Sequence, residues 1–309
     1  MNTAQAPSPR NKTLRFRPED APELAALCAV PEGALDAPAV ENRVLCGDCF
    51  ALAPRIAEGL FDLVIADPPY NLTKDYGGEV FSKTNEDAYE AFTERWVKEV
   101  RRLMKPGATL YVCCDWESSL TVGAVLKRHF TVRSRITWQR EKGRGAKKNW
   151  KNAMEDIWFC TLGDGYQFHL DAVKVRKKVI APYRENGEAK DWQETDGGKY
   201  RMTCPSNFWD DVTVPFWSMA ENTAHPTQKP EKLYAKLILA SSSENDLIFD
   251  PFGGSGTAAV VAKKLGRRYT VVEKNLQYCV WAQERLRRAE TDKTIQGFRD
   301  GVFRQRNES

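Results

Sequence analysis

Residues 249–257 read Phe-Asp-Pro-Phe-Gly-Gly-Ser-Gly-Thr, and this stretch decides the fold. The apolar run at 246–249 predicts a buried strand, and residues 258–265 after the glycines predict a helix. A glycine-rich loop between a strand and a helix is where an open parallel sheet binds nucleotide-like ligands, because glycine lets the backbone approach the ligand closely. The loop fits neither the dinucleotide pattern nor the P-loop pattern. Asp250 at its start disfavours a phosphate and suits a ligand with a positive centre.

The chain on either side of this loop alternates strands and helices. Towards the C-terminus, a predicted strand at 269–272 ends at Glu273, which stands at the spacing where an acidic side chain meets ribose hydroxyls. Other strands are predicted at 43–45, 61–66, 109–114 and 131–138, and helices at 50–59, 86–104, 121–130, 231–241 and 278–289. This rhythm predicts an α/β fold assembled from both halves of the chain.

The composition is that of a globular protein. The chain has 309 residues, of which 42% are hydrophobic, and a formal net charge of +4. No apolar stretch is long enough for a membrane helix, and residues 1–20 lack the apolar core of a secretory signal, so we expect no membrane contact and a cytoplasmic location. Eight cysteines in such a chain indicate reduced thiols, and the lone C-x-x-C of Cys46 and Cys49 predicts no metal site.

A second motif, Asp67-Pro68-Pro69-Tyr70, follows the predicted strand at 61–66. The two prolines lack N–H donors and stiffen the turn. The turn therefore fixes the Asp67 carboxylate and the Pro68 carbonyl beside the ring of Tyr70. Two acceptors beside an aromatic face suit a planar amino group, whose two hydrogens they can accept.

A basic segment interrupts the α/β rhythm from residue 139 to 220. A run of cations by itself is typical of a solvated basic loop, and it also suits the phosphates of double-stranded DNA, to which binding would be sensitive to salt. The candidate DNA-binding residues are Arg140, Lys142, Arg144, Lys147, Lys148 and Lys151.

Three blocks in a fixed order give the chain a family resemblance. Asp67-Pro-Pro-Tyr-Asn-Leu72, His225-Pro-Thr-Gln-Lys-Pro230 and residues 250–257 together resemble the β-class DNA amino-methyltransferases. Those enzymes use S-adenosylmethionine to methylate N6 of adenine or N4 of cytosine, and their catalytic block precedes their cofactor block. The resemblance implies a Rossmann-like methyltransferase sheet, mostly parallel and with helices on both faces, carrying an inserted target-recognition region.

The resemblance also implies a division of the chain and a role for each matching residue. Residues 41–138 would be the catalytic half, 139–220 the target-recognition region and 221–290 the cofactor half. The termini lie outside the resemblance, and their composition predicts a loosely ordered arm at 1–40 and a charged tail at 291–309. The residues implied to be catalytic are Asp67, Pro68, Pro69 and Tyr70. Those implied to bind the cofactor are Asp48, Cys49, Asp67, Thr227, Gln228, Lys229, Asp250, Phe252, Gly254, Ser255, Gly256, Thr257 and Glu273. Cys49 has the alternative of a small core residue, His225 is expected to support the site without reacting, and Gly253 matches a variable position.

The function implied is methylation of N6 in a flipped-out adenine of duplex DNA. Methylation of N4 in cytosine is the nearest alternative, because both reactions use this turn, although Asp67 favours adenine. An RNA or protein-glutamine substrate fits the block order less well, and a DNA-binding specificity protein without catalysis fits the intact motifs less well. The resemblance further implies a homodimer and a possible cognate restriction endonuclease as a partner.

Overall fold

The computed structural model describes residues 9–78, 80–140, 147–180, 183–195 and 198–306. Its centre is an eight-stranded sheet in the order β1-β15-β14-β2-β5-β7-β6-β13. The first five strands of that order are mutually parallel, whereas β7 is antiparallel to both its neighbours. The strands are β1 (Arg43–Cys46), β2 (Phe61–Ala66), β5 (Met104–Cys114), β6 (Thr131–Gln139), β7 (Met154–Thr161), β13 (Phe208–Trp209), β14 (Leu247–Asp250) and β15 (Arg268–Glu273).

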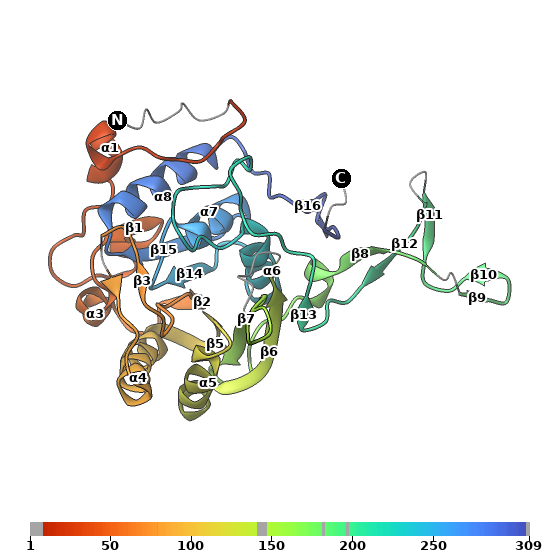
Figure 1. Cartoon of the computed structure of the whole chain (residues 1–309), viewed down its shortest axis with the longest axis horizontal. Coiled ribbons are helices and arrows are strands. Elements are labelled where there is room, and N and C mark those ends of the chain that lie inside the picture. The colour runs from red at the N-terminus through yellow and green to blue at the C-terminus, as the bar shows by residue number, and fades with distance from the viewer. Residues whose placement is uncertain (1–8, 79, 141–146, 181–182, 196–197, 307–309) are drawn as a thin grey trace.

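Helices cover both faces of this sheet (Figure 1). One face carries α3 (Cys49–Leu52), α4 (Glu86–Leu103) and α5 (Ser118–His129), and the other carries α6 (Glu231–Ser241), α7 (Thr257–Lys264) and α8 (Leu276–Arg288). Strand β2 shows why two layers form, since Leu63 and Ile65 pack into one core and Val64 and Ala66 into the other. The prediction of a mostly parallel sheet with helices on both faces is confirmed.

Helix α4 illustrates how local sequence sets the elements. Asn85 caps its start by accepting a hydrogen bond from the backbone of Ala88 at 2.8 Å. Tyr89, Trp96 and Val100 recur at helical spacing and are buried against the sheet. Burial of this apolar stripe, more than helix propensity, holds the helix in place.

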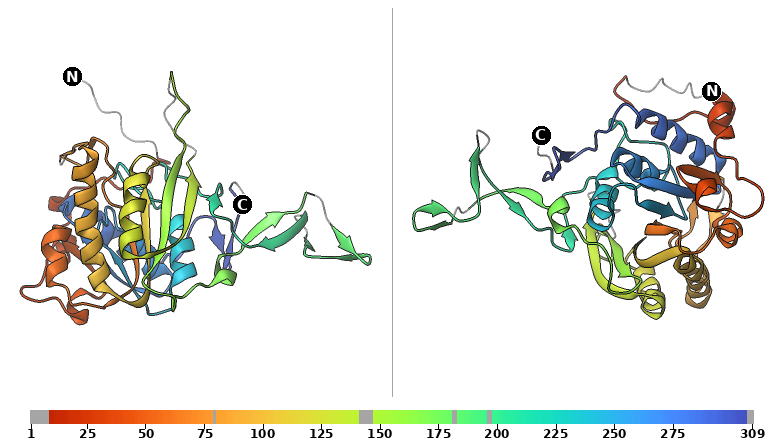
Figure 2. Two further views of the ribbon diagram at one scale, coloured as in Figure 1. Left: turned by 90° about the horizontal axis from the view of Figure 1, so that it is seen from below. Right: turned by 180° about the vertical axis from the view of Figure 1, so that it is seen from behind.

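A long arm, residues 174–203, projects from the body (Figures 1 and 2). It holds β8 (Val175–Lys178), β9 (Arg184–Glu185), β10 (Glu188–Ala189), β11 (Gln193–Thr195) and β12 (Gly198–Thr203). At its base, β17 (Val302–Phe303) pairs with β8, and β16 (Phe298–Arg299) pairs with β17. The C-terminal segment expected to be a charged tail is thus partly packed, and Phe303 is fully buried.

Two further segments differ from the division expected from the sequence. Strands β7 and β13 lie inside 139–220, yet both belong to the central sheet, β7 at an interior position and β13 at the edge beside β6. Within 1–40, the described residues dock on the body: Leu14 bridges to Thr223, and the Phe16 carbonyl accepts a hydrogen bond from Trp281 at 2.9 Å.

The remaining described elements are short: the helices α1 (Pro22–Ala26) and α2 (Ala37–Val40), the 3₁₀ turns Pro18–Asp20, Ala53–Arg55 and Leu170–Val173, and the hairpin of β3 (Lys74–Asp75) and β4 (Val80–Phe81). The helix expected at 50–59 is therefore one turn of α3 followed by a 3₁₀ turn. In the described part of the chain, no helix combines the length and apolarity needed to cross a bilayer.

Candidate active site

A cavity of about 530 Å³ opens at the carboxyl ends of the parallel strands. The loops after β1, β2, β14 and β15 line it, together with residues 225–229 and the β6–β7 hairpin. Ligands of open α/β sheets bind at this edge. The pairing of Ile248 with Leu63 and of Phe249 with Val64 makes β14 and β2 neighbours, so the glycine loop and the Asp67 turn meet in one site.

The glycine loop is shaped by its backbone and by tight packing. Gly254 and Gly256 have φ angles of +50° and +76°, in the left-handed region that favours glycine. A Cβ at Gly256 would lie 2.4 Å from the Cβ of Ala282, and one at Gly253 would lie 2.0 Å from Cγ1 of Val271. Gly253, expected to be variable, is therefore sterically required in this chain.

Glu273 closes one side of the cavity and is held in place by the backbone. Its Oε2 accepts a hydrogen bond from Gly254 N, and its Oε1 accepts one from Asn275 N, both at 2.8 Å. The carboxylate is thus fixed against the loop that it faces. Asp250 is buried, and its Oδ1 accepts a hydrogen bond from Phe252 N at 3.0 Å. Burial raises the pKa of Asp250 well above its usual value.

Asp48 and Cys49 line the same cavity at the start of α3. Asp48 caps the helix by accepting a hydrogen bond from Phe50 N at 2.7 Å. Cys49 is buried, and burial raises its pKa to about 12. The Cys49 thiol therefore stays protonated and acts as a small packing group at this wall.

The Asp67 turn is braced from both sides. Tyr70 Oη donates to Asp67 Oδ1 at 2.9 Å, so the first and last residues of the turn are tied together. Tyr89 of α4 donates to the Pro69 carbonyl at 3.1 Å. Within the described residues no donor reaches the Pro68 carbonyl, which leaves that oxygen available to a ligand.

Lys229 reaches across the cavity to this turn. Its Nζ lies 2.6 Å from Asp67 Oδ2 and 3.0 Å from Tyr70 Oη, and the side chain is 5% exposed. The resemblance implied that Lys229 binds the cofactor, and the structure places its ammonium group at the Asp67 turn. Burial opposes the charge of Lys229, but the neighbouring carboxylates Asp67 and Glu155 raise its pKa above the usual value.

Glu155 is a site residue that the sequence analysis missed. It lies on β7, is buried, and accepts hydrogen bonds from Arg140 Nη1 at 2.6 Å and Tyr70 Oη at 3.2 Å. Two adjacent carboxylates, Glu155 and Asp156, directly before the apolar residues 157–160 were the available signal, because a charged side chain is seldom buried without a partner. Its partners come from distant parts of the chain, which the sequence pattern does not show.

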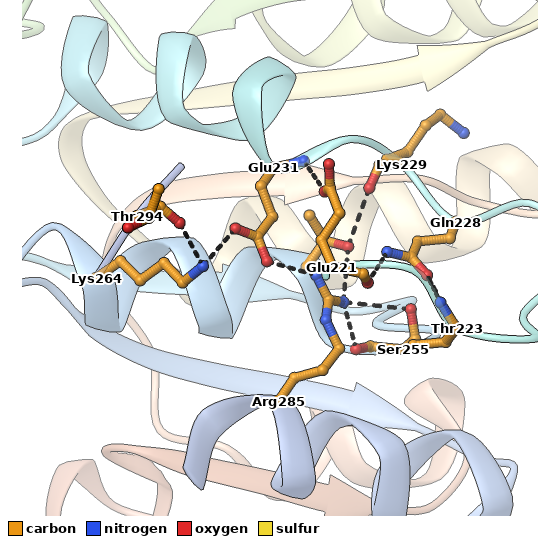
Figure 3. Close-up of polar contacts among 10 residues, drawn as sticks. Glu221, Thr223, Gln228, Lys229, Glu231, Ser255, Lys264, Arg285 and Thr294 are labelled. Carbon is orange, nitrogen blue, oxygen red and sulfur yellow. Dashed lines mark hydrogen bonds and ion pairs between the residues drawn. The ribbon is translucent and has the colours of Figure 1, made fainter. Parts of the chain in front are cut away.

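Residues 223–230 form one wall of the cavity, and hydrogen bonds from side chains hold this segment together (Figure 3). Gln228 donates to the Glu221 carbonyl at 2.7 Å and accepts from Thr223 N at 2.8 Å, so its amide holds the wall together. Thr227 N donates to Nδ1 of His225 at 3.3 Å. Thr227, Gln228 and Lys229 all line the cavity, but only Lys229 reaches the Asp67 turn.

Arg285 ties the glycine loop to the same wall. Figure 3 shows it reaching from α8 to Ser255 and Glu231, where it donates to the Ser255 carbonyl at 2.8 Å and to Glu231 Oε1 at 2.9 Å. It also donates to Thr257 Oγ1, which in turn donates to the Lys229 carbonyl at 3.2 Å. The backbone of Lys229 is thereby fixed relative to the loop.

His225 packs between the loop and α8. A Cβ at Gly254 would lie 3.0 Å from His225 Nε2, and the imidazole meets the Tyr278 ring edge-on at 4.4 Å. Burial, together with the nearby cations Lys229 and Arg285, lowers the pKa of His225 to about 3. His225 is therefore a neutral wall residue.

The candidate DNA-binding cations divide into three groups. Lys147, Lys148 and Lys151 are exposed in the connection between β6 and β7. Arg140 instead points into the cavity and pairs with Glu155. Lys142 and Arg144 lie outside the described residues.

Comparison with known proteins gives the family. A family model described as DNA methylase matches residues 61–284. The type II methyltransferase M.HpaI of Haemophilus parainfluenzae is 33% identical over 250 residues, covering 80% of this chain and 74% of that protein. The DNA adenine methyltransferase YhdJ of Escherichia coli K12 is 32% identical over 252 residues, covering 79% and 82%.

Solved structures support the fold. The cytosine-N4-specific PvuII DNA methyltransferase aligns with a TM-score of 0.58 at 16% identity, covering 83% of this chain and 92% of that one. The M1.HpyAVI–SAM complex aligns with a TM-score of 0.54 at 20% identity, covering 79% and 98%. With the family model spanning both the Asp67 turn and the glycine loop, the chain belongs to the N6/N4 DNA methylase family.

Proposed function

We propose that the protein transfers a methyl group from S-adenosylmethionine to N6 of an adenine in duplex DNA. One observation carries the proposal: the Asp67 carboxylate and the Pro68 carbonyl line the same cavity as the glycine loop and Glu273. The cavity thus offers a place for an amino group next to a place for a nucleoside-like methyl donor.

The residues of the cavity suit S-adenosylmethionine. Glu273, fixed by two backbone N–H groups, would accept hydrogen bonds from the ribose hydroxyls. Gly254 lines the cavity, with Asp48 and Phe252 on the wall beside it, whereas Gly256, implied to bind the cofactor, packs against Ala282 and is not among the lining residues. The acidic side chains suit a sulfonium and repel a phosphate. When bound, S-adenosylmethionine supplies an electrophilic methyl group.

The Asp67 turn would orient the amine. An exocyclic amino group is a weak nucleophile, because its lone pair is delocalised into the ring. If Asp67 and the Pro68 carbonyl accept its two hydrogens, the nitrogen becomes more tetrahedral and its lone pair turns towards the methyl group. Proton loss follows methylation, so Asp67 has to orient the amine and need not be a strong base.

The target adenine must leave the duplex to reach this turn, at a cost of a few kcal/mol. Tyr70, which lines the cavity, offers the base an aromatic surface. Asp67 at the first position of the turn, and the adenine specificity in the name of YhdJ, favour adenine over cytosine.

The connection between β6 and β7 would contact the DNA. Lys147, Lys148 and Lys151 present positive charge, and Trp150 between them is 93% exposed. Cations interleaved with an aromatic ring suit phosphates and unstacked bases. The arm adds further cations on β8 and β12. We also propose, from the family resemblance, a homodimer with a cognate restriction endonuclease as its companion enzyme, and, from the sequence composition, a cytoplasmic location.

Transfer of a labelled methyl group tests this proposal. The protein is incubated with methyl-labelled S-adenosylmethionine and, in separate reactions, unmethylated duplex DNA, RNA or a protein mixture. We expect label in duplex DNA alone, and none with Asp67→Ala, whose cofactor affinity should remain close to that of the wild type. Label in RNA or protein would contradict the proposal, and so would full transfer by Asp67→Ala.

A further inference from the structure

The side chains of Asp67, Tyr70, Glu155 and Lys229 meet at the Asp67 turn. Two of them already donate hydrogen bonds to the Asp67 carboxylate. Tyr70 donates to Oδ1, and Lys229 donates to Oδ2 at 2.6 Å. A target amino group also brings donors only. It would therefore approach a carboxylate whose two oxygens each already accept a hydrogen bond, one of them from an ammonium group.

The ammonium group of Lys229 would oppose the reaction if it stayed there. Methylation turns the amino nitrogen cationic until it loses a proton. Two positive nitrogens bound to one carboxylate repel each other, and burial makes this repulsion stronger than it would be in water. A shift of the Lys229 ammonium group away from Asp67 would relieve this repulsion.

A second carboxylate, that of Glu155, lies close to the ammonium group of Lys229. Glu155 Oε2 lies 3.4 Å from Lys229 Nζ, and Glu155 is 7% exposed at its side chain. Its other oxygen is held by Arg140 at 2.6 Å, so the carboxylate does not have to move. The backbone of Lys229 is fixed through Thr257, which leaves the flexible side chain to make the change.

We infer that Glu155 is a positioning residue that receives the ammonium group of Lys229 when a target amino group takes its place at Asp67. The inference rests on the proposed function and deepens it. The exchange keeps every buried charge paired, because two carboxylates (Asp67 and Glu155) face two cations (Lys229 and Arg140) before and after it. Removing the receiving carboxylate leaves Lys229 on Asp67.

A double-mutant cycle tests the inference with Glu155→Gln, Lys229→Met and the double variant. The readout is the single-turnover rate of methyl transfer to long unmethylated phage DNA at saturating DNA and cofactor. We expect Glu155→Gln to lower this rate by about tenfold or more. In the Lys229→Met background there is no lysine to displace, so the same substitution should lower the rate no further, and the charge-balanced double variant should exceed Glu155→Gln alone.

Three controls separate positioning from folding. Each rate is measured below the melting temperature of its variant and with cofactor saturating for that variant, because the buried charges also contribute to stability. Glu155→Asp should retain more of the rate than Glu155→Gln, and Glu90→Gln, on an exposed ion pair of α4, should be unchanged. Equal losses from Glu155→Gln with and without Lys229 would overturn the inference. A wild-type protein that transfers no methyl group at all would remove the proposed function together with it.

A second test needs no variant. Once the DNA sequence that the protein methylates has been mapped, the structure of the wild-type protein is determined with a duplex of that sequence and S-adenosylhomocysteine. We expect Lys229 Nζ to lie within about 3 Å of Glu155 and the base amino group at Asp67. Lys229 still bonded to Asp67 beside a bound base would contradict the inference.

Discussion

At the scale of single residues, Asp67 shows how the fold concentrates charge. It follows a strand that is buried on both faces, and the two prolines after it leave few backbone donors to stabilise its carboxylate. Burial raises the pKa of Asp67, and Lys229 opposes that rise. The nearby ammonium group of Lys229 therefore favours the charged form of the carboxylate against the effect of burial.

His225 gives a prediction for pH dependence. Its pKa in the folded protein is about 3, below the ordinary value of 6.5, so the folded state binds fewer protons than the unfolded state between these values. The contribution of neutral His225 is present above pH 6.5 and is lost as the pH falls towards 3. We expect His225→Gln to reduce the drop in unfolding free energy between pH 7 and pH 5, measured by urea denaturation. Equal drops in the two proteins would contradict this assignment.

At the scale of elements, the glycine loop could be predicted and its surroundings only in part. The helix predicted at 231–241 is α6 with the same bounds, because Pro230 starts it and the apolar period is local. Strand β7 was missed, because its partners β5 and β6 are set by long-range pairing and a basic stretch precedes it. Glu155 was missed with it, since its contacts with Lys229 and Tyr70 join residues 74 and 85 positions away.

Gly256→Ala tests the construction of the loop. The backbone at this position has a φ of +76°, which is strained for alanine, and the new Cβ would collide with Ala282 on α8. We expect the free energy of unfolding to fall by about 1–3 kcal/mol and cofactor affinity to fall with it. Both are measurable by denaturation and calorimetry. Gly165→Ala is the matched control, because its Cβ would meet nothing within 4 Å. Equal stabilities of the two variants would show that the loop is not packed as described.

Reversal of charge between β6 and β7 tests the DNA surface. Replacing Lys147 and Lys148 by Glu removes two exposed cations and adds two anions. We expect weaker binding to duplex DNA and a shallower dependence of the binding constant on salt, because fewer counterions are released. Cofactor affinity should not change. A salt slope equal to that of the wild type would exclude these lysines from the interface.

At the scale of the whole molecule, one sheet collects chemistry from distant parts of the chain. The Asp67 turn, the wall at 223–230 and the glycine loop come from both halves of the sequence, yet all line one cavity. The order of these blocks could be recognised from the sequence. The arm could not, because its base is completed by β17 from the C-terminal end, paired with β8 across more than a hundred residues.

Truncation of the arm tests its independence from the cofactor site. Arg176 pairs with Met202 in an antiparallel ladder, so an Asn-Gly turn can join them in place of residues 177–201. We expect the shortened protein to fold and to bind cofactor normally, because the cavity lies in the body. Its affinity for duplex DNA should fall, as a gel-shift titration would show. Unchanged DNA affinity would exclude the arm from the DNA surface, and loss of cofactor binding would show that the arm supports the body.

The identity of the methylated atom tests the central claim most directly. Duplex DNA treated with the protein and S-adenosylmethionine is digested to nucleosides and analysed by mass spectrometry against standards. An amino-group clamp formed by Asp67 and the Pro68 carbonyl predicts N6-methyladenosine in its deoxy form. N4-methylcytosine would support the role of Asp67 and the Pro68 carbonyl in binding an amino group but would show that the target base is cytosine. Methylation at a ring carbon, or no methylation at all, would contradict the account.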